Sequence, residues 1–143
     1  VCSSDLSSFG MPQRVITGIE HKQVILIAAI LEKYLHVKFS ANDIFFKVSG
    51  GIKLKEQTTD LAIALSLLSS YFQKPLPPKS LALGEISLTG QVKPISQAQT
   101  HVKEGRTFGI EKFFLANTQK IEEPKKDCYF FSSVYELLKL FPE

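Results

Sequence analysis

The sequence has 143 residues, of which 44% are hydrophobic and 22% are charged, so it suits one packed domain and is too short for two. Its densest apolar stretch, Val24 to Leu31, is far shorter than the roughly 20 residues that cross a bilayer, so we expect no membrane insertion. The net charge of +3 is mildly basic, which permits a polyanionic partner without requiring one.

The first six residues, VCSSDL, lack an initiator methionine and resemble a translated sequencing adapter. We therefore expect residues 1–6 to be non-native and the domain to occupy residues 7–143. The two cysteines, Cys2 and Cys128, have no metal-binding spacing and no further cysteines to pair with. Free thiols in a reducing cytoplasm are the simplest interpretation.

A helix is predicted over His21 to Leu35, because Val24, Ile27 and Leu31 recur at steps of three and four residues. Apolar and aromatic residues then alternate from Asp43 to Val48 and stop at two glycines, which predicts a strand.

The junction KEQTTDLA, at residues 55–62, joins a polar segment to an apolar helix. Residues 61–68 are apolar nearly all round, so this helix should be central in the core, with Thr59 or Asp60 as its N-cap. Pro75 and its neighbours should end it.

Short strands are predicted near residues 81–83 and 91–93, with a hairpin that turns at Thr89 and Gly90. Ser96 and Gln99 have the spacing of a capping box, so a third helix should start there and end near Thr107.

Two further strands are predicted, at residues 113–115 and 129–131, on either side of the polar loop 117–126. Ser133 and Glu136 should cap a last helix. Helices and short strands thus alternate, which indicates a mixed α/β domain with crossover connections.

No phosphate-binding G-x-x-x-x-G-K-[ST] motif occurs, so this chain should not hydrolyse nucleotides by itself. The histidines, His21, His36 and His101, lie on separate segments without an acidic cluster, so we expect no metal site. Thr58, ahead of a helix N-terminus, is a candidate nucleophile with His101 or a lysine as base; the simpler interpretation is a cap.

Several blocks carry a family resemblance: PQRVITGIE, AAILEK, DIFFKVSGGIK, DLAIALSLLSS and LGEISLTGQVKPI. In this order they resemble the C-terminal domain of the RadA (Sms) family of bacterial DNA-repair proteins, over about residues 8–140. That domain is similar to the proteolytic domain of Lon. The resemblance implies a Lon-like mixed α/β fold, with the two-layer sheet and packed helices of ribosomal-protein domain 2.

Lon peptidases use a serine nucleophile and a lysine base, and the shared blocks place Thr58 and His101 at these two positions. The resemblance therefore implies that the dyad is lost and the chain is not an enzyme. A threonine–histidine pair is chemically conceivable as a degenerate peptidase, but the charge of Asp60 opposes an oxyanion beside it. The chain departs from the RadA pattern at Gln57 and Ala116, where prolines are usual.

The resemblance implies a scaffold and DNA-contacting domain of a hexameric, ATP-driven branch-migration helicase, with DNA and a recombinase filament as partners. The zinc finger and ATPase core would precede residue 7, so ATP, Mg and Zn are implied only for that part, and no cofactor for this chain. The basic candidates for DNA contact are Arg14, Lys53, Lys55, Lys93, Lys103 and Arg106. The alternatives are a Lon-like domain of the ComM or magnesium-chelatase kind, the degenerate peptidase, and a plain oligomerisation module.

Overall fold

The computed structural model describes residues 2–7, 14–17, 21–39, 43–48, 56–121 and 127–141. Its elements are β1 (Cys2–Ser7), β2 (Arg14–Thr17), α1 (His21–Leu35), β3 (Asp43–Val48), the 3-10 turn η1 (Glu56–Thr59), α2 (Asp60–Phe72), β4 (Ser80–Leu83), β5 (Glu85–Ile86), β6 (Val92–Lys93), α3 (Ala98–Thr107), β7 (Lys112–Ala116), β8 (Cys128–Phe131), α4 (Val134–Leu137) and the 3-10 turn η2 (Leu138–Leu140). The predicted mixed α/β character is confirmed.

The described strands form three small sheets. β4, β7 and β8 are parallel with β7 in the centre, and β5 and β6 form the predicted hairpin. β3 lies between β1, which is antiparallel to it, and β2, which is parallel. All residues of β1 except Ser7 belong to the segment 1–6 that was expected to lie outside the domain.

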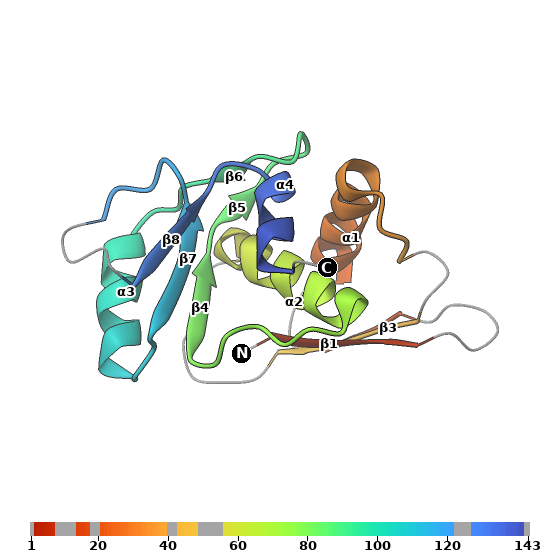
Figure 1. Cartoon of the computed structure of the whole chain (residues 1–143), viewed down its shortest axis with the longest axis horizontal. Helices are drawn as coiled ribbons and strands as arrows, with labels where there is room; N and C mark the ends of the chain where they lie inside the picture. The colour runs from red at the N-terminus through yellow and green to blue at the C-terminus, as the bar shows by residue number, and fades with distance from the viewer. Residues whose placement is uncertain are drawn as a thin grey trace.

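The core is divided by the β4–β7–β8 sheet. Along β7, Phe113 and Leu115 join a cluster with α3, whereas Phe114 and Ala116 join the larger cluster with α1 and α2. Successive side chains of a strand point to opposite faces, so a four-residue apolar run fits a strand covered on both sides. α2 lies between this sheet and the β1–β3 strands (Figure 1).

Three local predictions on helix ends are tested by the structure. Gln73 in the left-handed conformation ends α2 just before Pro75, as expected. The Ser96–Gln99 capping box is wrong, because α3 begins at Ala98 and its N-cap, Gln97, makes no side-chain cap bond.

Ser133 is the N-cap residue of the last helix, as predicted, but its side chain makes no cap bond. The carboxylate of Glu136 accepts hydrogen bonds from the backbone N–H of Ser132 at 3.1 Å and from its hydroxyl at 2.5 Å, not from Ser133. These two bonds lower the pKa of Glu136. One residue of register separates the prediction from the observed contact.

Candidate functional site

The start of α2 follows Thr58, which the resemblance to Lon predicts at the position of the nucleophile. The backbone N–H of Gly84 donates to the carbonyl of Thr58, and the N–H of Leu61 donates to the carbonyl of Gly84, both at 3.1 Å. A Cβ on Gly84 would lie 3.2 Å from Val92 Cγ1 and 3.3 Å from Leu61 Cδ2. The end of β4 therefore approaches the helix closely, and one of the first N–H groups of α2 is already used.

Thr59 occupies the N-cap position of α2, but its side chain makes no cap hydrogen bond. Asp60 is the first helical residue and does not cap either. The prediction that Thr59 or Asp60 is the N-cap residue of this helix is therefore confirmed for Thr59 by position, although its side chain makes no cap bond. The 3-10 turn η1 runs directly into α2, so Thr59 has helical backbone angles, with φ of −91° and ψ of −4°.

Asp60 is buried, at 8% exposure, and its carboxylate joins three elements. Oδ1 accepts a hydrogen bond from Gln23 Nε2 of α1 at 2.6 Å, and Oδ2 accepts one from the Ile86 N–H of β5 at 3.1 Å. Burial raises the pKa of Asp60, the two hydrogen bonds oppose this, and the nearby charge of Glu85 adds to it. The carboxylate of Asp60 therefore connects α2 to α1 and to the β5–β6 hairpin through buried hydrogen bonds.

Thr58 is only 5% exposed, so its hydroxyl is not presented to solvent. Gln23 Nε2 also donates to Thr59 Oγ1, at 3.1 Å. Hydrogen-bonded polar groups and a carboxylate therefore occupy the space around the helix start. Among the described residues, these hydrogen bonds connect α1, α2 and β5, and they do not supply exposed donors for an oxyanion.

His101, the other residue of the predicted dyad, lies in α3, and its imidazole lies near an acidic side chain of the same helix. Its Nδ1 is 3.8 Å from Glu104 Oε2 in the same helix and is buried without a hydrogen-bond partner. α3 packs on the face of the sheet that carries Phe113, whereas α2, which follows Thr58, packs on the opposite face.

The six basic candidates differ in what surrounds them. Lys53 and Lys55 lie outside the described residues, and Arg14 lies in β2, where only the backbone is described. Lys93 in β6 and Lys103 in α3 are exposed.

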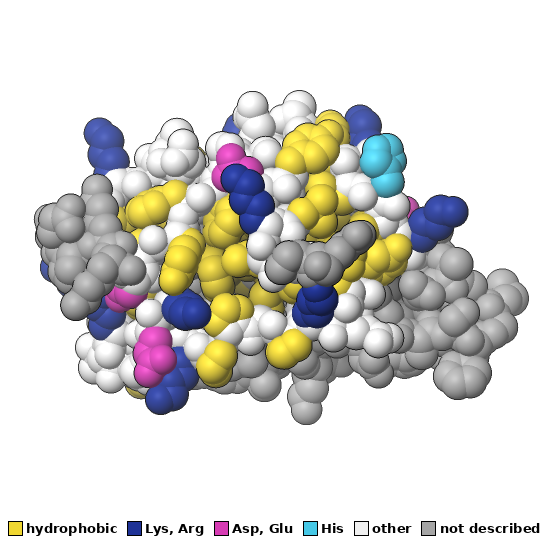
Figure 2. Space-filling view, viewed as in Figure 1, with side chains coloured by type: hydrophobic (Ala, Val, Ile, Leu, Met, Phe, Trp, Pro, Cys, Tyr) yellow, Lys and Arg dark blue, Asp and Glu magenta, His cyan; other side chains and the backbone are white. Residues whose placement is uncertain are grey.

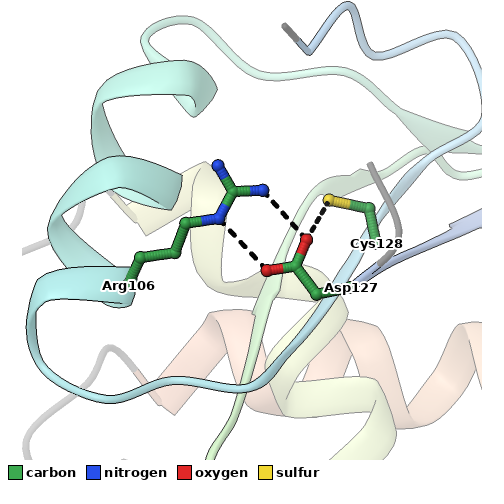
Figure 3. A network of polar contacts seen from close by, with 3 residues as sticks. All are labelled: Arg106, Asp127 and Cys128. Atoms are coloured by element: carbon green, nitrogen blue, oxygen red, sulfur yellow. Dashed lines mark hydrogen bonds and ion pairs between the residues drawn. The ribbon is translucent and has the colours of Figure 1, made fainter. Parts of the chain in front are cut away.

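Arg106, in contrast, forms an ion pair with Asp127 of the same chain (Figure 3). Its Nε and Nη2 donate to Oδ2 and Oδ1 of Asp127 at 3.1 and 2.9 Å, and the guanidinium lies 5.7 Å from the ring centroid of Phe113. The Cys128 thiol donates to Asp127 Oδ1 at 3.6 Å. The guanidinium holds the pKa of Asp127 below its usual range, and the carboxylate raises the pKa of Arg106.

Sequence reasoning missed this ion pair. Asp127 stands at the end of a polar loop and Arg106 twenty-one residues earlier, so only the packing of α3 beside β8 brings them together. The only hint in the sequence was the acidic residue Asp127 directly before the strand, and this position does not indicate which basic residue it pairs with.

Among the described residues, no group of three or more histidine, cysteine or acidic side chains is placed to hold a metal ion. In the same residues, no helix combines the length and apolarity that a membrane span requires.

Comparison with known proteins agrees with the blocks described above. A family model described as subunit ChlI of Mg-chelatase matches residues 4–119. The DNA repair protein RadA of Bacillus subtilis is 39% identical over 121 residues, which is 83% of this chain and 26% of that protein. RadA of Synechocystis is 34% identical over 113 residues, and these cover 79% of this chain and 22% of that relative.

The chain spans about a quarter of the length of the curated relatives it matches. It belongs to the family described as subunit ChlI of Mg-chelatase and is homologous to the C-terminal 120 or so residues of bacterial RadA, at 34–39% identity.

Proposed function

We propose that this chain is a non-catalytic, Lon-like scaffold and DNA-contacting domain of a cytoplasmic RadA-type helicase that drives DNA branch migration in recombinational repair. The relation to RadA carries the proposal. ATP, Mg and Zn would be bound by other parts of the parent protein, which would assemble as a hexameric ring on DNA with a recombinase filament.

The start of α2 supports a non-catalytic role. Thr58 is buried, the N–H of Leu61 donates to the Gly84 carbonyl, and the carboxylate of Asp60 lies at the same helix start. A negative charge beside a developing oxyanion raises the barrier that a peptidase must lower. A serine- or threonine-directed active-site probe should therefore leave Thr58 unlabelled, and labelling there would support the degenerate peptidase instead.

Two exposed lysines, Lys93 and Lys103, support contact with a nucleic acid backbone. A lysine that reaches a phosphate releases counterions, so binding weakens linearly with the logarithm of the salt concentration. Arg106 is a weaker candidate than these two, because Asp127 already neutralises its charge.

The test is duplex DNA binding by Lys93→Ala/Lys103→Ala across a salt series. We expect about tenfold weaker binding at low salt and a salt slope smaller by about 2. Lys22→Ala/Lys120→Ala is the matched control, because it removes the same charge from two other exposed lysines. Equal losses in the two doubles would mean that only the net charge matters, and no binding by the wild type would leave a plain oligomerisation module.

A second candidate is the Lon-like domain of a ComM or magnesium-chelatase-related ATPase, which the description of the matching family favours. The two candidates are compared by their affinity for DNA. DNA binding that Lys93→Ala/Lys103→Ala weakens would favour the RadA type, whereas no binding by the wild type would leave both this candidate and the plain oligomerisation module.

A further inference from the structure

An exposed aromatic patch lies away from the start of α2. It consists of Lys33 and Tyr34 at the end of α1, Leu88 in the β5–β6 turn, and Tyr135 in α4, and we call it the Tyr34 patch. Leu88 is 69% and Tyr135 56% exposed. Figure 2 shows hydrophobic side chains at the surface over α4 and toward α1, with Lys or Arg side chains nearby.

The patch is held rigidly from three elements. The hydroxyl of Tyr34 donates to the Leu88 carbonyl at 3.2 Å, and the rings of Tyr34 and Tyr135 meet edge to face at a centroid distance of 6.1 Å. Gly90, with φ of +83°, turns the hairpin so closely that a Cβ there would lie 3.2 Å from the Tyr34 ring. A fixed aromatic surface loses little conformational entropy when a ligand stacks on it.

The charge around the aromatic pair is positive on the α1 side. Lys33 Nζ lies 5.2 Å from the centroid of the Tyr34 ring. Glu32, the next residue back, turns inward, and its carboxylate accepts the N–H of Phe39. Glu136 remains an acid beside Tyr135, but its oxygens bond back to Ser132, and Lys139 acts on it electrostatically.

We propose that the Tyr34 patch binds single-stranded DNA, with a base stacked on the exposed ring of Tyr135 and a phosphate near Lys33. Bases stack on aromatic rings whatever their sequence, and an adjacent cation holds the backbone, which is the combination found in single-strand binding surfaces. The proposal rests on the proposed function and adds to it a strand that becomes unpaired, as branch exchange requires.

The test uses the whole chain with a fluorescently labelled 20-nucleotide oligothymidylate and a duplex of equal length, with binding followed by anisotropy at low salt. Tyr135→Ala should weaken single-strand binding about tenfold and duplex binding much less, because only an unpaired base can stack on the ring. Tyr135→Phe keeps the ring and should bind as the wild type does. Lys33→Ala should weaken both and reduce the salt slope by about 1.

Phe108→Ala is the matched control, because Phe108 is an even more exposed aromatic, at 72%, at the end of α3 and outside the patch. It should leave both affinities unchanged. Melting curves of all variants check that these surface changes preserve the fold.

Several results would overturn the proposal. If DNA binding persists but Tyr135→Ala and wild type bind the single strand equally, the patch has no part in it, while the proposed function stands. If no DNA binds at all, both fail. If Tyr135→Ala instead abolishes concentration-dependent self-association in light scattering, the patch is an interface between copies of this chain.

Discussion

Two aspartates of this domain are each held by nitrogen donors, yet their surroundings are opposite. Asp60 is buried among uncharged donors, Gln23 and a backbone N–H, and its pKa is raised. Asp127 is partly exposed against the cation Arg106, and its pKa is lowered. The charge of the partner and access to water, more than the number of hydrogen bonds, therefore decide whether ionisation stabilises the fold.

The largest expected effect follows from removing the buried acid. Asp60→Ala leaves the Ile86 N–H and the Gln23 amide without this acceptor, and it should lower the free energy of unfolding by about 2–4 kcal/mol. Urea unfolding followed by circular dichroism measures this. Asp127→Ala is the comparison variant, and a larger loss there than at Asp60 would reverse the ranking of the two sites.

The pH dependence should separate the two acids by sign. A raised native pKa means that the folded state holds more protons than the unfolded state, so the contribution of Asp60 is greatest below its unfolded pKa and is lost as pH rises through its folded pKa. The lowered pKa of Asp127 gives the opposite: its contribution is present above the unfolded pKa and is lost as pH falls through the folded value.

Unfolding measured between about pH 3 and 7 tests these signs. Asp60→Asn should remove the decrease of stability with rising pH that the wild-type acid contributes. Asp127→Asn should remove a rise of stability with pH at the acid end. If Asp60→Asn leaves the wild-type pH profile unchanged, burial does not control the ionisation of Asp60.

A change at Gly105 tests whether packing against Phe113 or the Arg106–Asp127 ion pair contributes more to holding α3 on the sheet. A Cβ at Gly105 would lie 2.8 Å from Cε1 of Phe113, a fully buried ring that also lies beside the Arg106 guanidinium. Gly105→Ala should therefore destabilise the fold by about 1 kcal/mol, because overpacking costs about 1–3 kcal/mol and better helix propensity returns about 1. Thermal unfolding measures it, with Thr107→Ala as an exposed control in the same helix; a stabilised Gly105→Ala would contradict the close packing.

The smallest expected effect concerns the Arg106–Asp127 pair itself. Arg106→Gln removes the charge but keeps a hydrogen-bonding side chain, and it should cost about 0.5–1 kcal/mol, because such partly exposed pairs contribute little. A double-mutant cycle with Asp127→Asn isolates the coupling. A coupling above 2 kcal/mol would place this pair on the level of Asp60.

Much of the fold was predictable from local pattern. The ranges of α1 and β3 are the predicted ones, and the hairpin turn at Thr89 and Gly90 is confirmed. These features depend on periodicity and on glycine conformation, which neighbouring residues express. The N-cap residues Thr59 and Ser133 are the predicted ones, but the N-cap of α3 is Gln97 in place of Ser96. The side-chain bonds at these helix starts differ from the predicted ones because several hydroxyl and acid residues stand near each start, and a shift of one residue changes the partner.

The local residue pattern was enough to predict where the apolar faces lie, the helices and most of the strands, with β1 and β2 as exceptions, and ordered blocks of residues predicted the relation to RadA. The roles of the polar side chains depend instead on the packing of distant segments. Asp60 connects three elements because α1 and β5 meet at the start of α2. Arg106 forms an ion pair with Asp127 because α3 packs beside the residue that precedes β8. A side chain's burial and charge partner come from segments distant in sequence, and no local pattern contains them.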